Sequence, residues 1–578
     1  MKRCPQCHRI ETDDTLAFCR ADGAALISES SSVSGEAGTI KLVSGSVSSE
    51  TKTNLRPNQA DSAITRATAA TTVLPTTTTA ATTRELSKSR RLGFVFATMG
   101  LAVIVIAAAA YFYISRNRQT TIESIAVLPF ENRSNDTDAD YLSDGIAESI
   151  INSLTRLPNL KVIPASTALR YKSKASDPQK AGEELRVNAV LSGRMIQRGD
   201  NVTINVELDD VRYGKQLWGE QYNRKLSDLL AVQNEIANEI SQRLRTELSG
   251  EERQKLTKGS TTNPEAYQLY LKGRFYFFKS TVDGLTKAVE CFNQAIDRDP
   301  SYAQAYAGLA DTYNWLALVK VPPREAIPRM KAAAQKALQI DESLADAHTS
   351  LAITLYEFDY DWPAAEREFK RAIELNPDYA PAHYEYGWFL ASRRRYQESI
   401  DKFNQAMQLE PLNVKIIVDN SVPYTLLKQF DRGLEFTRKG EELEPNSYYC
   451  YVTEGWIYTR KGDYQTAIAK SQKALQLENT PWTQGWLGCA YALAGDRPNA
   501  QKILDKLSED SKQRYVSPYF SAEIYAALKD KEKTIEYLQK AYADKSTWLT
   551  FLGVDDVFDF VRSEPRFQEI ARGVGVPQ

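Results

Sequence analysis

Three cysteines and an aspartate near the amino terminus are the residues best suited to binding a metal ion. Cys4 and Cys7 form a CxxC pair that contains Pro5, and Cys19 and Asp22 repeat the same spacing as CxxD. A structural zinc ion takes four ligands, mostly thiolates, and an Asp or a His can complete the set. The spacing therefore predicts a structural zinc site made by Cys4, Cys7, Cys19 and Asp22.

The first 27 residues resemble a small zinc ribbon in which an aspartate stands where a fourth cysteine is usual. His8 is a competing fourth ligand. Two alternatives remain open: a ribbon that has lost its metal, or three free thiols in a tail. In each case the range 1–27 is too short for an enzyme. Its basic residues, such as Lys2, Arg3 and Arg9, are too few to indicate DNA binding.

The composition of the whole chain argues against two functional classes. Its 72 Lys and Arg residues face 74 Asp and Glu residues, so the net charge of −2 gives no general basic surface for nucleic acid. Only three histidines are present. A phosphate-binding loop, a kinase catalytic loop and a GxSxG motif are all missing from the sequence. We therefore expect no enzyme, no nucleic acid partner and no small-molecule substrate.

An uncharged apolar stretch from Leu92 to Ile114 predicts one transmembrane helix. Its 23 residues would span about 34 Å as a helix, which exceeds a hydrocarbon core of about 30 Å. A signal peptide is the alternative. We disfavour it because the stretch begins far from the amino terminus and is too long for the apolar core of a signal peptide.

The basic residues on the two sides of this stretch predict its orientation. Four precede it closely and two follow it. By the positive-inside rule, the side richer in Lys and Arg stays in the cytoplasm. We therefore expect a single-pass protein of the bacterial inner membrane, with a cytoplasmic amino terminus and residues 115–578 outside. The residues counted are Arg84, Lys88, Arg90 and Arg91 before the stretch, and Arg116 and Arg118 after it.

Residues 28–91, between the amino-terminal head and the apolar stretch, are predicted to form a disordered linker. They are rich in Ser, Thr and Ala and include TTVLPTTTTAATT. They lack periodic apolar residues whose burial could offset the entropy lost on ordering. Such a composition is typical of a flexible tether.

Residues 121–250 combine strand and helix patterns, which predicts an α/β domain. Ser124–Phe130 is a short apolar strand, and Val202–Leu208 alternates apolar with polar residues, as in a strand with one buried face. Tyr141–Leu157 has apolar residues at helical spacing. Four acidic residues precede or begin that helix, and we interpret them as a solvated loop at a helix amino terminus rather than a cation site. They are Asp136, Asp138, Asp140 and Asp144.

Five motifs in this region resemble the TolB amino-terminal-like domain. IAVLPFEN, YLSDGIAESI, SGRMIQRGDNVTINVEL, GKQLWGEQY and LLAVQNEIANEI occur in this order within residues 122–248. The resemblance implies an α/β fold without catalytic residues, placed between a membrane helix and helical repeats in bacterial signalling proteins. In such relatives a kinase, a nucleotide cyclase or a DNA-binding domain often occupies the cytoplasmic end. Here the zinc-ribbon-like head takes that place.

From residue 263 to 545 the chain shows a regular internal repeat with a period of about 34 residues. Ala372, Ala406 and Gly440 are each one period apart, and a proline stands at the same offset after each of them. This pattern resembles the tetratricopeptide repeat (TPR), with small residues where two helices touch, aromatic residues between them and a turn residue at the end. We expect about eight helix pairs that bury their apolar faces by stacking on their neighbours. Residues 546–578 are expected to cap the last pair.

Five aromatic residues are predicted to form a protein-binding groove on the inner face of this solenoid. Projecting the repeat onto the first helix of each pair places them on or near the concave side. Aromatic side chains in such a groove would anchor a partner peptide. The alternative is a shift of one residue in the repeat register, which would return them to the core. The five residues are Tyr384, Trp388, Tyr449, Trp456 and Trp482.

These expectations describe a non-enzymatic, membrane-anchored scaffold or sensor that binds proteins or peptides outside the cytoplasm. The alternative is a transducer that relays occupancy of the solenoid to the zinc-ribbon-like head. The expected fold class is multidomain. Its parts are a zinc-ribbon-like head (1–27), a linker (28–91), a transmembrane helix (92–114), an α/β domain (121–250), an all-α TPR solenoid (263–545) and a cap (546–578).

Overall fold

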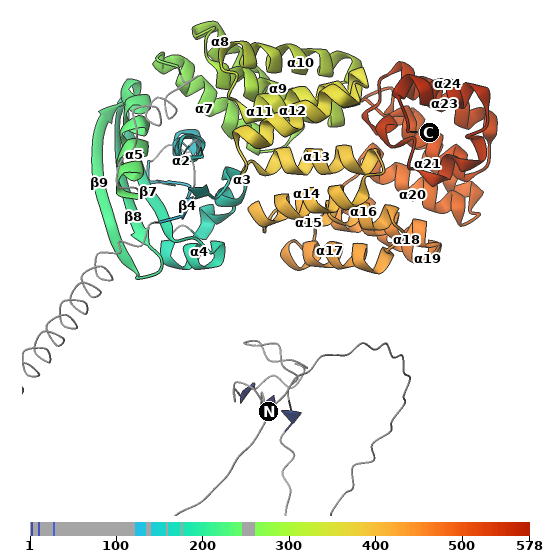
Figure 1. Ribbon diagram of the computed structural model, residues 1–578, viewed down its shortest axis with the longest axis horizontal. Coiled ribbons are helices and arrows are strands. Elements are labelled where there is room, and N and C mark those ends of the chain that lie inside the picture. The colour runs from blue at the N-terminus through green and yellow to red at the C-terminus, as the bar shows by residue number, and fades with distance from the viewer. Residues whose placement is uncertain are drawn as a thin grey trace, which may run out of the picture. The chain divides into compact units, whose positions relative to one another are not determined.

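The computed structural model describes most of the chain beyond residue 121 and six residues nearer the amino terminus (Figure 1). The chain divides into two units, Met1–Met99 and Gly100–Gln578. In the first unit β1 (Lys2–Arg3), β2 (Ile10–Glu11) and β3 (Ile27–Ser28) form an antiparallel sheet with β1 in the middle. The other described residues are 122–134, 140–155, 157, 160–174, 177–244 and 261–577.

Three of the sequence predictions fall outside the described residues. They are the zinc site of Cys4, Cys7, Cys19 and Asp22, the linker 28–91 apart from Ser28, and the transmembrane helix 92–114. Within the described ranges, no helix has both the length and the apolar character needed to cross a bilayer. In the same ranges, no group of three or more His, Cys, Asp or Glu side chains could hold a metal ion. The zinc and membrane predictions therefore stay predictions.

The α/β domain contains a mixed six-stranded sheet with the order β6-β4-β7-β8-β9, in which β5 also pairs with β7. β4 runs parallel to β6 and β7, whereas β7, β8 and β9 form an antiparallel meander. The residues of β8 alternate between buried and more exposed positions, which matches the predicted one-sided strand. The strands are β4 (Ser124–Val127), β5 (Glu131–Asn132), β6 (Lys161–Val162), β7 (Ala189–Arg198), β8 (Asn201–Asp210) and β9 (Lys215–Lys225).

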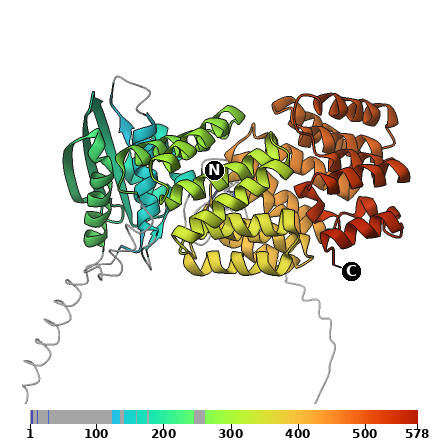
Figure 2. The same ribbon diagram turned by 90° about the horizontal axis from the view of Figure 1, so that it is seen from above.

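Helices cover both faces of this sheet. Ile125 and Val127 share a hydrophobic core with α2 (Asp140–Leu154) and α5 (Leu229–Leu244). The alternate residues Ala126 and Leu128 belong to a second core with α4 (Pro178–Leu185), as expected when successive side chains point to opposite faces. Figure 2 shows the domain from above, with α5 lying against the long strands. The predicted α/β region is confirmed.

The described residues from 264 to 543 form eight antiparallel helix pairs in a solenoid. The first helix of the third pair continues as the π-helical turn η4 (Leu355–Asp359), and the first helix of the fifth pair is broken into two. The pairs are α7 (Pro264–Phe278) with α8 (Val282–Arg298), α9 (Ala303–Val319) with α10 (Pro323–Ile340), α11 (Ala345–Thr354) with α12 (Trp362–Leu375), α13 (Ala380–Ser392) with α14 (Tyr396–Leu409), α15 (Val414–Asp419) and α16 (Ser421–Leu426) with α17 (Phe430–Leu443), α18 (Tyr448–Lys461) with α19 (Tyr464–Leu477), α20 (Pro481–Leu493) with α21 (Arg497–Asp510), and α22 (Pro518–Ala527) with α23 (Lys531–Ala543).

Small residues let the helices of the solenoid approach one another around buried aromatic rings. The ring of Phe292 on α8 is fully buried between Gly273 on α7 and Gly308 on α9. A methyl group on either glycine would lie 2.7 Å from that ring, which is closer than atoms pack in protein cores. Phe369 and Phe403, which are one repeat period apart, are fully buried in the same way. The predicted TPR-like solenoid is confirmed.

The α/β domain packs on the first helix pair of the solenoid. Leu271 on α7 packs against Gly145 on α2, and both sides contribute residues to one continuous core. A buried ion pair joins Glu148 of α2 to Arg274 of α7. Separating the two domains would leave these charges unpaired in an apolar interface, which is costly.

The carboxy-terminal tail, residues 546–577, contains η5 (Thr547–Phe551), η6 (Asp556–Val561) and α24 (Pro565–Val574). It packs on α22 and α23, and it also contacts helix pairs far away in the sequence. The indole Nε1 of Trp362 donates to the carbonyl of Val574 at 2.8 Å, and Arg393 donates to the carbonyl of Gly575 at 2.7 Å. The tail therefore bridges the last pair and the third and fourth pairs, a role that goes beyond the expected cap.

Candidate functional site

A cavity of about 60 Å³ lies between the first helices of the fourth to eighth pairs and the tail. We call the surface made by these first helices the inner face. Five of the eight tryptophans of the chain line the cavity. They are Trp388 on α13, Trp456 on α18, Trp482 and Trp486 on α20, and Trp548 on η5.

The structure brings four of the five predicted groove residues to this cavity. Trp388, Tyr449, Trp456 and Trp482 line it. Tyr384 does not line it: this residue is 6% exposed, and its ring meets that of Phe403 edge to face. The hydroxyl of Tyr384 nevertheless donates to Asp419, which lines the cavity. Whether a partner binds here stays a prediction.

The repeat period explains why these side chains meet. Trp388, Val422 and Trp456 all line the cavity and follow one another at intervals of one repeat period. Each therefore has the same position on the first helix of its pair, and stacking of successive pairs lines up such positions on one face. Trp486 follows Trp482 by one helical turn, which places both on the same side of α20.

The tryptophan rings contact one another and form an ordered aromatic wall. The rings of Trp456 and Trp486 are stacked, with centroids 5.5 Å apart and planes inclined by 20°. The ring of Trp486 meets that of Trp482 edge to face, with centroids 5.1 Å apart. The ring centroid of Trp482 lies 6.3 Å from that of Trp548 in the tail. Such offset and edge-to-face arrangements are the favourable ones for aromatic pairs. The wall thus combines rings from the solenoid and from the tail.

Charged groups complete the lining of the cavity. The guanidinium of Arg460 pairs with Asp555 at 2.6 Å and with Asp556 at 2.8 Å, and it lies 5.0 Å from the ring centre of Trp456. This geometry combines an ion pair with a cation–π contact. Because these two carboxylates belong to the tail, Arg460 also holds the tail against α18.

Two other carboxyl groups face the cavity. Asp419 accepts hydrogen bonds from the hydroxyls of Tyr384 at 2.5 Å and Tyr449 at 2.8 Å, and burial raises its pKa to about 6. Burial, together with the nearby carboxyl of Asp555, raises the pKa of Glu523 well above its usual range. Both shifts have the same main cause, since a charged carboxylate is poorly solvated in this apolar setting.

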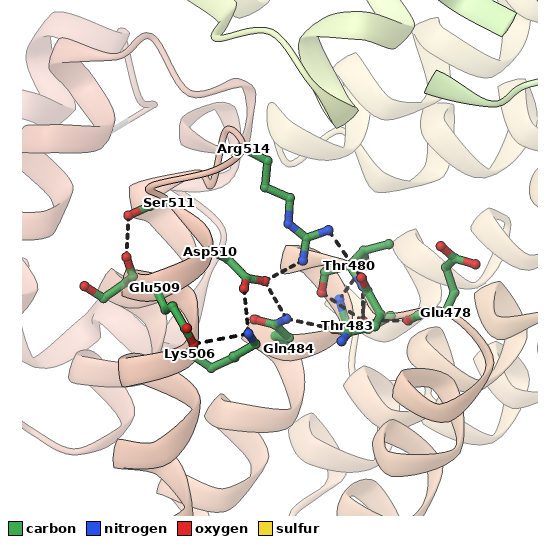
Figure 3. A network of polar contacts seen from close by, with 11 residues as sticks. Glu478, Thr480, Thr483, Gln484, Lys506, Glu509, Asp510, Ser511 and Arg514 are labelled. Carbon is green, nitrogen blue, oxygen red and sulfur yellow. Dashed lines mark hydrogen bonds and ion pairs between the residues drawn. The ribbon is translucent and has the colours of Figure 1, made fainter. Parts of the chain in front are cut away.

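A polar network fixes the helix that carries Trp482 and Trp486. Figure 3 shows Asp510 at its centre, where it accepts from Gln484 at 3.0 Å and pairs with Arg514 and Lys506. Burial opposes ionisation of Asp510, but these donors outweigh it and lower its pKa to about 2. At the start of α20, the side chains and backbone N–H groups of Thr480 and Thr483 form a capping box. The network therefore holds α20 against α21.

Sequence reasoning missed several residues of the cavity. Trp486 could have been found from its spacing of one turn after Trp482. Trp548 and Asp555 could not, because the tail lies outside the repeat and its return to the inner face leaves no periodic signal. Glu523 lies on the less regular eighth pair. The missing residues thus come from where the repeat pattern weakens or ends.

The two described members of the acidic cluster, Asp140 and Asp144, are ion-paired, and burial of Asp144 raises its pKa. Asp140 begins α2, and Lys172 contacts both Asp140 at 3.3 Å and Asp144 at 2.7 Å. Asp136 and Asp138 lie outside the described residues. The position of Asp140 fits the predicted acidic helix amino terminus, whereas the largely buried Asp144 is not part of a solvated loop.

The antiparallel helix pairs and their constant step define the class of this part of the chain: residues 264–543 form a solenoid of tetratricopeptide-repeat type. A family model described as a tetratricopeptide repeat matches residues 360–413. A second family model, described as the second domain of HilA/YgeH-like transcriptional regulators, matches residues 120–239, which covers the α/β domain. The resemblance to the TolB amino-terminal-like domain is not part of these matches and stays a prediction.

Several known proteins are similar to parts of the chain. A putative adenylate cyclase 3 of Rhizobium meliloti is 34% identical over 40% of this chain and 40% of its own length. The transcriptional regulator HilA of Salmonella typhimurium is 24% identical over 51% of this chain and 52% of its own length. The human mitochondrial import receptor subunit TOM70 is 25% identical over 37% of this chain and 38% of its own length. The chain therefore spans about half or less of each of these relatives.

Two solved structures match parts of the chain at low TM-scores. PilF of Pseudomonas aeruginosa is 20% identical, with a TM-score of 0.30, and the match covers 41% of this chain and all of that one. A tetratricopeptide repeat protein of Parabacteroides merdae is 13% identical, with a TM-score of 0.31 over 54% of this chain and 99% of that one.

Proposed function

We propose that this protein is a non-enzymatic scaffold or sensor that binds a protein segment at the inner-face cavity. The observation that carries the proposal is the gathering of Tyr449 and five tryptophans around one cavity, four of them on the first helices of the repeats and one, Trp548, on the tail. Tryptophan and tyrosine supply a large share of the binding energy at protein interfaces, because they bury much area at little entropic cost. The ion pair between Arg460 and Asp555 of the tail adds two charged groups to the lining of the cavity.

The proposal extends to the amino-terminal part of the chain. The protein would be anchored in the bacterial inner membrane through residues 92–114, with the α/β domain and the solenoid outside the cytoplasm. Cys4, Cys7, Cys19 and Asp22 would hold a structural zinc ion. The support is the charge asymmetry around the apolar stretch and the CxxC and CxxD spacing. Alkaline phosphatase fused to the carboxy terminus would be active if this orientation is correct and inactive if it is reversed.

A transducer is the second candidate, and the relatives favour it. One is named a transcriptional regulator and another a putative adenylate cyclase, so similar regions occur in proteins with different outputs. In this chain, occupancy of the solenoid would be relayed to the zinc-ribbon-like head. Residues 1–91, used as bait in cells, should then retain a cytoplasmic protein. A passive anchor would retain none.

The main proposal is tested by cross-linking in cells that express the full chain, followed by purification. The double variant Trp388→Ala/Trp456→Ala removes two of the five tryptophan side chains that line the cavity, and it should lose the cross-linked partner. Trp315→Ala, on α9 and away from the cavity lining, is the matched control and should keep it. Thermal midpoints of all variants show whether each remains folded. Equal capture by the double variant and the wild-type protein would refute the proposal.

A further inference from the structure

We propose that the end of the six-stranded sheet at which β4 begins lies on the lipid headgroups of the membrane, with Tyr213 inserted among them. This inference rests on the membrane anchor of the proposed function, residues 92–114, and specifies which surface of the chain faces the bilayer. It holds for either side of the membrane. We call this surface the entry end. It consists of Ile122, Glu123, Lys161, Arg186, Asn188 and residues 211–215.

The chain between the proposed anchor and the α/β domain is short. Seven residues, 115–121, separate Ile114 from Ile122. Ile122 is 7% exposed and belongs to the core of the domain, so this residue is fixed in the fold. Because a chain extends by at most about 3.6 Å per residue, the Cα atoms of Ile114 and Ile122 lie at most about 29 Å apart. The entry end is therefore the part of the domain that the anchor keeps nearest to the bilayer.

Hydrogen bonds join the start of β4 to the other segments of the entry end. The carbonyl of Glu123 accepts from the backbone N–H of Lys161, the first residue of β6, at 2.9 Å. The backbone N–H of Glu123 donates to the side-chain oxygen of Asn188 at 3.1 Å. The carbonyl of Asn188 accepts in turn from the N–H of Val211 at 2.9 Å. Two bonds through Asn188 thus connect the start of β4 with the turn between β8 and β9.

This turn carries a large and strongly exposed aromatic side chain. Tyr213 is 67% exposed, which is more than any other large hydrophobic side chain of the described residues. A single exposed apolar side chain is ordinary on a protein surface. Its position makes this one informative, because it lies at the end of the domain nearest to the anchor. Tyrosine is enriched at the headgroup level of membranes, where its ring meets an apolar layer and its hydroxyl stays in water.

Three basic side chains of the entry end are free to contact phosphate. Lys161, Arg186 and Lys215 are exposed, and none of them forms an ion pair with another described residue. Arg212 differs from them, because it is paired with Asp210 at 2.7 Å. Lysine and arginine donate strong, charge-assisted hydrogen bonds to phosphate groups. Lipid headgroups supply such phosphates at the level expected for Tyr213.

The entry end is not strongly basic overall. Glu123 and the half-buried Asp209 lie there, and Glu183 and Glu184 of α4 lie close to Arg186 in the sequence. These carboxylates weaken any long-range attraction to an anionic surface. The basic side chains therefore act through direct contact with phosphates, at the short distance that the anchor imposes.

The experiment uses the purified full chain in vesicles of phosphatidylethanolamine and phosphatidylglycerol. A photo-cross-linking amino acid replaces Tyr213 in one sample and Asn201 in another. Asn201 is the matched control, because it is exposed at the other end of β8. After illumination, intact-mass spectrometry should find phospholipid adducts from position 213 at a yield at least about fivefold above that from position 201, since the ends of this strand lie about 30 Å apart. No adduct from position 213, or equal yields from both, would overturn the inference.

Substitution of the lysines tests their contacts with phosphate. In the double variant Lys161→Gln/Lys215→Gln, the yield of adducts from position 213 should fall at least about twofold, because two donors to phosphate are lost. Lys225→Gln is the matched control and should leave the yield unchanged, because this exposed lysine lies opposite Asn201. All three lysines are exposed, so the variants should keep the circular dichroism spectrum of the wild-type protein. An unchanged yield in the double variant would overturn the role given to the basic side chains.

Extraction with alkaline carbonate separates this inference from the proposed function. Carbonate releases proteins that lie on a membrane and leaves those that span it, so the full chain should stay with the vesicles. If carbonate releases the chain, the proposed anchor is wrong and the inference fails with it. If the chain stays but position 213 gives no lipid adduct, the inference alone fails and the anchor stands.

Discussion

Four carboxyl groups on the first helices of the repeat pairs have pKa values raised to between about 6 and about 8. Burial is the main cause in each case, and neighbouring acidic side chains add to it for three of the four. A buried carboxylate loses solvation, so the protonated form is favoured. The pKa values are about 7 for Asp311, about 8 for Glu357, about 7 for Glu385 and about 6 for Asp419.

These groups predict that the folded chain loses stability as the pH rises from about 5 to about 8. Because their folded pKa values exceed those of the unfolded chain, the folded state binds more protons in this window, and stability falls with increasing pH. His383, whose pKa is lowered by burial, acts in the opposite direction but is a single group. The thermal midpoint of the full chain, followed by calorimetry, should decrease across the window.

A substitution checks the origin of this pH dependence. Glu385→Gln removes one titrating group and should flatten the decrease in the thermal midpoint between pH 5 and pH 8. Glu536→Gln is the control, because the lysines beside Glu536 lower its pKa to about 2, outside the window. A midpoint that rises over this range, or an unchanged slope in Glu385→Gln, would contradict the assignment.

At the scale of single elements, close helix contacts around aromatic rings hold the repeats together. Gly308→Ala would place a methyl group 2.7 Å from the ring of Phe292. Overpacking of this kind costs about 1–3 kcal/mol. The local opening free energy of α8 and α9, measured by amide hydrogen exchange, should fall by this amount. A local measurement is preferable because repeat arrays need not unfold in one step.

Gly433→Ala provides the matched comparison on α17. Its new methyl group would lie 3.0 Å from the hydroxyl of Thr425 and no closer than 3.5 Å to any other atom. Alanine favours a helix over glycine by about 0.5–1 kcal/mol. We therefore expect this variant to be neutral or slightly stabilised. A similar fall in the local opening free energy of both variants would contradict this account. It would show that contact with the Phe292 ring is not why alanine is unfavourable at position 308.

The sequence predicted these elements well where its pattern is regular. The constant step between Ala372, Ala406 and Gly440 located the helix pairs, and the alternation in Val202–Leu208 located β8. The break between α15 and α16 was not predicted, although Pro423 signals it, because a proline ring conflicts with the carbonyl four residues earlier, that of Asp419, where α15 ends. Four of the five predicted groove residues line the cavity, and Tyr384 does not.

At the scale of the whole molecule, the return of the tail to the inner face is the feature that the sequence did not reveal. The hydrogen bond between Trp362 and Val574 joins residues 212 positions apart. No local pattern encodes such a contact, because it depends on the summed rotation of the successive pairs between them. The cavity exists in its present form only because this return adds Trp548 and Asp555 to it.

Arg460→Ala tests how the tail is held. The change removes the buried partner of Asp555 and leaves that carboxylate unpaired, which costs about 3–5 kcal/mol. Amide exchange in residues 546–577 should accelerate accordingly. Lys531→Ala is the control, because its pair with Glu564 is exposed and contributes at most about 1 kcal/mol. Unchanged exchange in Arg460→Ala would mean that the tail is held by its apolar contacts alone.

The central claim is that the inner-face cavity is where a protein partner binds. The most direct measurement places a photo-cross-linking amino acid at Leu426, a partly exposed residue of the cavity lining, and in a second strain at Gln501, an exposed residue of α21 outside it. After illumination of cells that express the full chain, we predict a partner adduct from Leu426 and none from Gln501. An adduct from Gln501 alone would contradict the account and place the binding surface on the outer helices.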